Sequence, residues 1–249
     1  MSIDSTSFEG KIKPEFSSKG LEKPYSAEYR LNLDWLVCVY SHEKQTKGIN
    51  SNQSFMKYSL LFNNIRKNID LTAAEESLFE SLLEEKSISK KKSLIKEGQP
   101  NEYLYFVLKG CFRAYSIDKN GFQHILQFAP ADWWITDMYS FITENPASLN
   151  IDAIEDTSCL AISKSNLEKA YSEIPKLERH FRILLEKNVV ANRKRIIDRL
   201  SLTALERFDA FCKTYPDLVN KIPQKQVASY IGITPEFLSK VKYEYFRSM

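Results

Sequence analysis

The sequence is poor in the residue types that mark many common catalytic and metal sites. Its 249 residues include three histidines and four cysteines. His42, His124 and His180 fall in three different segments, and no cysteine belongs to a C-x-x-C pair, which argues against zinc, thiol-redox and iron–sulfur sites. No Ser-His-Asp arrangement or glycine-rich phosphate loop stands out. We therefore predict that the protein is not an enzyme and has no cofactor and no metal site.

Long apolar stretches are also missing. The most apolar early stretch, LNLDWLVCVY at residues 31–40, spans ten residues and includes Asp34, whereas a membrane-spanning helix needs roughly 20 apolar residues. The N-terminus lacks the basic start and apolar run of a signal peptide. Widely separated cysteines are typical of a reducing compartment. These features predict a cytoplasmic protein that has no membrane partner.

Charge is distributed unevenly along the chain. The formal net charge is +3, but residues 176–249 contain 15 basic and 8 acidic side chains, whereas residues 1–175 contain 20 and 24. A basic C-terminal third attached to a mildly acidic body indicates a polyanionic partner for that third. Charge alone is equally compatible with an ordinary solvated helical surface.

The patterning divides the chain into four predicted parts. Residues 1–55 are polar and interrupted by glycine and proline, which predicts a flexible extension in which residues 31–40 could be ordered. Residues 56–175 are predicted to form a β-rich domain. Residues 176–200 are predicted to form one long helix, and residues 201–249 a C-terminal helical domain.

The β-rich part begins with a helix and continues with short strands. Thr72 and Glu75 have the spacing of a capping box at the start of a helix. Short β-rich runs follow, and Lys109-Gly110 and Asn120-Gly121 between them are typical of hairpin turns, the second of type I′. The segment TDMYSFIT predicts a short helix before two more strands near residues 149–154 and 158–162. The predicted fold class is therefore α+β, with an antiparallel β-roll or jelly roll.

The long helix has a regular apolar seam. Apolar and small residues step by 4, 3, 4 and 3, with one asparagine in the seam, as in two-stranded coiled coils in which a polar residue sets the register. This spacing predicts a homodimer; the alternative is a helix packed on its own domain, with the asparagine exposed. The predicted seam consists of Leu177, Phe181, Leu184, Asn188 and Ala191.

The C-terminal stretch IPQKQVASYIGITPEFLSKVKYEYF combines two short helical patterns around one glycine. Gly232 suits the left-handed backbone that ends a helix abruptly, and Thr234 and Pro235 suit the start of the next one. Ala228 is small enough for a second helix to cross close above it. This arrangement predicts a helix-turn-helix, although a plain helical hairpin has similar spacing.

A helix-turn-helix reads DNA with the N-terminal half of its second helix. Glu can accept a hydrogen bond from cytosine, and Lys can donate to guanine. Lys225 and Lys242 are better placed for phosphates. The predicted DNA-binding residues are Thr234, Pro235, Glu236, Ser239, Lys240, Lys225 and Lys242.

A β-roll followed by a long helix and a C-terminal helix-turn-helix resembles the Crp/Fnr family of bacterial transcription regulators. The likeness covers about residues 56–247, and the motifs ADWWITDMYSF and LSLTALERFDAFCKTYPDLVNKIPQKQVASYIGITPEFLSK resemble members from Bacteroidetes-type bacteria. The resemblance implies a homodimer on a palindromic double-stranded DNA operator, with RNA polymerase as a further potential partner. The family's base-contacting positions fall on Pro235, Glu236 and Lys240; the first is commonly Arg, so the target sequence should differ.

The resemblance also implies an effector pocket in the roll. In relatives that bind cyclic nucleotides, a Gly-Glu pair and a later Arg-Ser or Arg-Thr pair hold the ligand. These pairs fall on Thr136-Asp137 and Ala147-Ser148, so the phosphate-binding Arg is replaced by alanine. We expect an unknown small-molecule effector that is not cyclic AMP, or none. Trp133 and Tyr139 are candidate lining residues, although aromatic residues here could equally belong to the core.

Two other function classes are alternatives to a DNA-binding regulator. One is a small-ligand-binding sensor module without DNA binding, whose helical tail serves dimerisation or protein contacts. The other is an enzyme with a cupin-like roll, which would need clustered metal ligands that the three dispersed histidines do not supply. The basic C-terminal third and Lys240 favour the DNA-binding regulator.

Overall fold

The structure is a computed structural model that describes residues 53–247, with side chains from residue 58 onward. The predicted flexible extension and the apolar stretch at residues 31–40 lie outside the described residues, except that helix α2 begins at Gln53. The helices are α2 (Gln53–Arg66), α3 (Ala73–Ser81), α4 (Met138–Thr143), α5 (Lys164–Glu173), α6 (Lys176–Ser201), α7 (Ala204–Thr214), α8 (Gln224–Ile231) and α9 (Pro235–Arg247). The strands are β1 (Glu84–Ile88), β2 (Ser93–Ile95), β3 (Tyr103–Lys109), β4 (Cys111–Ile117), β5 (Gln123–Pro130), β6 (Trp134–Ile135), β7 (Asn150–Ala153) and β8 (Thr157–Ser163).

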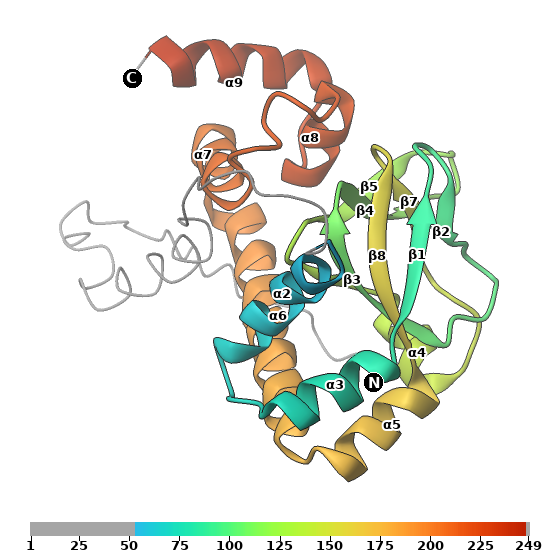
Figure 1. Ribbon diagram of the computed structural model, residues 1–249. Coiled ribbons are helices and arrows are strands. Elements are labelled where there is room, and N and C mark those ends of the chain that lie inside the picture. Colours follow the sequence, from blue (N-terminus) through green and yellow to red (C-terminus); the bar gives the residue numbers. More distant parts are fainter. Residues whose placement is uncertain (1–52, 248–249) are drawn as a thin grey trace, which may run out of the picture. The chain divides into compact units, whose positions relative to one another are not determined.

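The strands form two four-stranded antiparallel sheets. One sheet has the order β1-β8-β3-β6 and the other β2-β7-β4-β5. Side chains from both sheets, including Val107 and Cys159 of the first and Phe112 and Ile151 of the second, share one buried cluster. The strands gather into a single β-structure with α3, α4 and α5 near one end of it (Figure 1). The predicted α+β class with an antiparallel roll is confirmed.

The two predicted hairpins had different outcomes. Strands β4 and β5 pair around Asn120-Gly121, which confirms that hairpin. Its turn is not of type I′, because only Gly121 of the two has a positive φ, and the Asp118 carboxylate accepts hydrogen bonds from the amides of Asn120 and Phe122. The hairpin at Gly110 is wrong: β3 and β4 belong to different sheets, and Gly110 is where the chain passes from one to the other.

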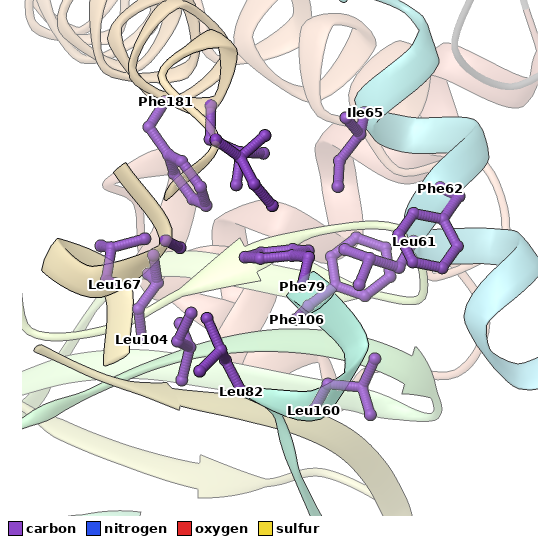
Figure 2. Close-up of a cluster of buried hydrophobic side chains, with 14 of the residues drawn as sticks. Leu61, Phe62, Ile65, Phe79, Leu82, Leu104, Phe106, Leu160, Leu167 and Phe181 are labelled. Atoms are coloured by element: carbon purple, nitrogen blue, oxygen red, sulfur yellow. The ribbon is translucent and has the colours of Figure 1, made fainter. Parts of the chain in front are cut away.

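Local signals in the helices were reliable. Thr72 and Glu75 form the predicted capping box of α3, and Asp137 caps α4 within the segment that predicted a short helix. Helix α5 was not predicted. Together α2, α3, α5 and the start of α6 bury apolar side chains against the sheet β1-β8-β3-β6; Figure 2 shows Phe79 and Leu61 beside Phe106 of β3.

Helix α6 corrects the predicted dimer seam. Leu177 and Phe181 are buried at 0% and 6% exposure in the core of this chain, and Leu184 packs against the same cluster. Figure 2 shows Phe181 in this cluster. Side chains that are buried within one chain cannot contact a second chain. Leu177 and Phe181 therefore belong to the core of this chain, and a dimer contact through the other seam residues stays a prediction. Asn188 and Ala191 are exposed.

The three C-terminal helices pack around their own apolar side chains. Helix α7 begins with a second capping box, formed by Thr203 and Glu206. Phe208 and Phe211 of α7, Val227 of α8 and Leu238 of α9 are buried in one cluster, which also includes Phe128 of β5. No helix among the described residues is long and apolar enough to cross a membrane.

Candidate functional site

Helices α8 and α9 are joined by a tight turn centred on Gly232. Its φ of 75° and ψ of 46° are left-handed, and its amide donates to the Ala228 carbonyl. The amide of Phe237 donates to the Thr234 hydroxyl, so Thr234 caps α9 directly before Pro235. The small Ala228 is fully buried, together with Val227, Ile231, Leu238 and Val241. The turn, the cap and the inward-facing positions are therefore those that the sequence predicted.

The outer face of this helix pair carries the polar residues that were predicted to contact DNA. Thr234, Glu236, Ser239, Lys240 and Lys225 are exposed, whereas Pro235 and Lys242 are half-buried. The pKa of Glu236 is lowered by its own backbone amide at the start of α9 and by the Thr234 hydroxyl. Glu236 is therefore an ionised hydrogen-bond acceptor on a surface that also offers an exposed ammonium group.

The segment that contains the two predicted effector pairs, residues 136–148, is called the cassette below, and one buried carboxylate organises it. Asp137 is 1% exposed. Its Oδ1 accepts from the amides of Tyr139 and Ser140, at 3.0 and 3.3 Å, and its Oδ2 from the amides of Ser148 and Leu149, at 2.6 and 2.9 Å. The Ser148 hydroxyl adds a fifth bond at 3.1 Å. Asp137 of the first predicted pair therefore accepts from Ser148 of the second, and the chain itself supplies the anion that these donors bind.

The other predicted cassette residues support this arrangement. Thr136 donates to the Tyr103 carbonyl and accepts from the Asn101 side chain. Ala147 is buried, and its backbone exchanges hydrogen bonds with Gly98 and Gln99. Tyr139 is 53% exposed and does not line the interior of the roll.

Trp133 packs away from the cassette. Its ring lies 5.6 Å from that of Tyr215, which belongs to the C-terminal helical cluster. Trp133 also touches the core between the two sheets. It is a packing residue shared by two clusters, and sequence alone did not distinguish this role from that of a pocket lining.

A cavity of about 330 Å³ lies elsewhere on the roll. It is lined by β1, β2, β3 and the loop between β2 and β3, including Lys86, Tyr103 and Tyr105. The Lys86 ammonium sits 3.7 Å above the centre of the Tyr103 ring. None of the six predicted effector residues lines this cavity. Among the described residues, no group of His, Cys, Asp and Glu side chains could hold a metal ion.

One connection between α8 and the roll had no signal in the sequence. The Ser229 hydroxyl accepts from the Ile125 amide at 3.0 Å and donates to the Gln123 carbonyl at 2.8 Å. Strand β5 is at the edge of its sheet, so one side chain of α8 satisfies backbone groups that a neighbouring strand would otherwise pair. Nothing in the local pattern around Ser229 indicates a partner more than 100 residues away.

Comparison with known proteins agrees with this architecture. Residues 85–173 match the family model of the cyclic nucleotide-binding domain. The roll has the cyclic nucleotide-binding fold. No curated protein sequence matches the chain.

Two solved structures resemble both the roll and the helices that follow it. One is the c-di-GMP responsive global regulator CLP of Xanthomonas campestris, with 12% identity, a TM-score of 0.59 and coverage of 71% of this chain and 93% of that one. The other is FixK2 of Bradyrhizobium japonicum, with 22% identity, a TM-score of 0.59 and coverage of 67% and 85%. The structural neighbours are regulators of the Crp/Fnr type. At these identities the likeness establishes the fold.

Proposed function

We propose that this protein is a homodimeric, sequence-specific DNA-binding transcription regulator of the Crp/Fnr type. The observation that carries the proposal is the exposed polar face of α9, which follows a tight turn and begins with Thr234, Glu236, Ser239 and Lys240. A helix presented in this way can enter the major groove with its N-terminal residues on base edges. The basic balance of residues 176–249 supplies attraction to the DNA backbone.

Each side chain on α9 has a role that suits its chemistry. The ionised Glu236 accepts from a cytosine amino group, and Lys240 donates to guanine acceptors. Lys225 and Lys242 neutralise phosphates. Pro235 occupies a half-buried first position on the helix and offers no donor, so the operator differs from those read by relatives with arginine there.

The part of α6 from Leu185 onward offers a surface for the second copy. Leu185, Val189, Ile196 and Leu200 are 43%, 65%, 61% and 84% exposed. Their spacing of 4, 7 and 4 residues places them in one stripe along the helix. This stripe lies one residue position, about 100° around the helix, from the seam predicted by sequence. Pairing two such stripes removes from water apolar side chains that the subunit alone leaves exposed.

We further propose that cyclic nucleotides are not effectors. The Asp137 carboxylate occupies the donors of Ser148 and Leu149, and Ala147 replaces the phosphate-binding arginine. Arg113, a cationic side chain on a nearby strand, is held by Asp152 through two bonds of 2.6 and 2.8 Å. A cyclic phosphate would therefore meet a carboxylate and no available arginine.

The DNA-binding proposal is tested by selection from random duplexes with the full chain. Binding of the selected duplex and a scrambled one is then compared for the native protein, Lys240→Ala and the control Lys225→Ala. Losing a base contact costs about 1–3 kcal/mol, so Lys240→Ala should weaken the selected duplex about tenfold and the scrambled one little. Lys225→Ala should weaken both similarly. Failure of the native protein to enrich any sequence contradicts the proposal and leaves the sensor module without DNA binding.

The effector proposal is tested by calorimetric titration with cyclic AMP and cyclic GMP. We expect no heat of binding at micromolar ligand and no change in DNA affinity. Micromolar binding that also raises DNA affinity would overturn it.

A further inference from the structure

The solvent side of α9 carries aromatic rings as well as charges. Phe237, Tyr243 and Phe246 are 48%, 68% and 53% exposed. Phe246 packs edge-on against Tyr245 at 5.4 Å. The Tyr243 side chain makes no hydrogen bond, ion pair or ring contact with another residue that the structure describes, and it is the most exposed of the three rings.

Tyr243 continues the row of residues that we propose to read DNA. Glu236, Lys240, Tyr243 and Arg247 are spaced by 4, 3 and 4 residues, which aligns them on one face of a helix. Leu238 and Val241 are buried on the opposite face. At a rise of 1.5 Å per residue, Tyr243 lies about 4.5 Å beyond Lys240 and about 10 Å beyond Glu236 along the axis. The separation of about 10 Å between Glu236 and Tyr243 is comparable to the width of the major groove, about 12 Å.

The chemistry around Tyr243 points to duplex DNA as the surface that covers it. Lys240, Lys242 and Arg247 lie within four positions of Tyr243 along α9, whereas Glu244 is the one acidic residue in the same range. A partner must therefore combine anionic groups with a small apolar feature that a ring can cover. In the major groove, phosphates provide the first and the thymine C5-methyl group provides the second.

We propose that Tyr243 is a specificity-determining residue whose ring packs on a thymine methyl group beside the base pair contacted by Lys240. This inference rests on the proposed DNA-binding function and adds a residue that the sequence pattern had not singled out. The alternative for the same residue is a hydroxyl bond to a phosphate, which would carry no sequence information.

The experiment removes the methyl group and the ring separately. Each thymine of the selected duplex is replaced in turn by deoxyuridine, and dissociation constants are measured for the native protein, Tyr243→Ala, Tyr243→Phe and the control Phe246→Ala. Burying one methyl group contributes about 0.8 kcal/mol. The native protein and Tyr243→Phe should therefore lose about fourfold at one thymine per half-site. Tyr243→Ala should bind the thymine duplex about fourfold more weakly and show no further loss with deoxyuridine. Phe246→Ala should behave as the native protein.

Three results would overturn the proposal, and they can be told apart. If Tyr243→Ala loses as much as the native protein on methyl removal, the methyl group has a different partner. If Tyr243→Phe is as weak as Tyr243→Ala on every duplex, the hydroxyl binds phosphate. If the native protein selects no sequence, the DNA-binding function itself fails. Equal melting temperatures of the four proteins, expected for such exposed positions, show that the variants are folded.

Discussion

At the scale of single residues, Asp137 holds the cassette between α4 and β7 together. Its carboxylate accepts four backbone amides and one hydroxyl while nearly fully buried. Replacing it by alanine would leave buried donors without an acceptor, and each such group costs about 1–3 kcal/mol. We expect Asp137→Ala to lower the free energy of unfolding by about 3 kcal/mol or more in urea titrations. The exposed Asp217→Ala should change it little, and equal effects of the two changes would show that the five bonds add nothing to stability.

His180 is a second buried polar residue with a defined protonation state. It is 0% exposed, and the Asn68 side-chain amide lies 3.0 Å from its Nδ1. The Lys187 ammonium donates to the Asn68 oxygen, which turns the Asn68 NH₂ toward the imidazole, so Nδ1 is the acceptor and Nε2 carries the proton. Burial, followed by the nearby charges of Lys187 and Lys67, lowers the pKa of His180 to about 4 from its usual 6.5.

The lowered pKa of His180 makes the folded state less stable in acid. The unfolded chain binds the proton near pH 6.5 and the folded chain only near pH 4, so stability is lost as pH falls between these values. The loss amounts to about 3 kcal/mol at a conversion of 1.36 kcal/mol per pH unit. Urea titrations from pH 7 to 4 should show a steep decline for the native protein and His124→Gln, and a shallower one for His180→Gln. Parallel profiles for all three would refute the assignment.

At the scale of elements, the turn between α8 and α9 depends on one backbone conformation. A Cβ at Gly232 would meet only the Arg199 Nε at 3.8 Å, so there is space for a side chain. The constraint is the φ of 75°, which costs an ordinary residue roughly 1–2 kcal/mol and a β-branched one more.

We therefore expect Gly232→Val to lower the free energy of unfolding by about 2 kcal/mol and to weaken DNA binding. Gly232→Asn should have a smaller effect, because asparagine tolerates left-handed backbone. Thermal melting and binding to the selected duplex measure both effects. Similar losses for the two variants would indicate that space around residue 232, and not its backbone angle, sets the cost.

At the scale of the whole molecule, α6 buries side chains in its first turns and exposes apolar side chains in its later turns. Its first turns bury Leu177, His180 and Phe181 inside the subunit. Its later turns expose Val189 and Leu200 on another side. One helix thus belongs to the core at its start and leaves an apolar stripe exposed further on, which we propose as the contact with a second copy.

Two glutamate substitutions separate the two seams. Val189→Glu puts a charge into the exposed apolar stripe, whereas Ala191→Glu puts one into the seam first predicted from spacing. We expect the native chain to sediment at about twice 28.9 kDa at micromolar concentration, Val189→Glu to sediment as a monomer and Ala191→Glu to remain a dimer, because a charge buried without a partner is costly. If Ala191→Glu dissociates the dimer and Val189→Glu does not, the dimer contact lies on the seam that was predicted from spacing.

The sequence by itself determined the features that depend on neighbouring residues. The Thr72–Glu75 capping box, the short helix after Asp137, the hairpin at Gly121 and the turn at Gly232 are where the patterns predicted them. Caps and turns are made by hydrogen bonds within about four residues and by backbone preferences of single residues, so a short window contains their causes. The antiparallel roll followed from the same regular spacing of strands and turns.

Only the tertiary structure decided between the two roles that the local sequence allowed for Gly110, Phe181 and Asp137. Gly110 reads as a hairpin turn, but β4 pairs with β5 and β7, so Gly110 joins two sheets. Phe181 fits a dimer seam, but its ring is covered by the subunit's own Trp134 and Tyr171. Asp137 reads as one more charge near a ligand, but Ser148 and Leu149 fold back onto its carboxylate. Burial and hydrogen bonding depend on which groups are near in space, and distant parts of the chain supply those groups.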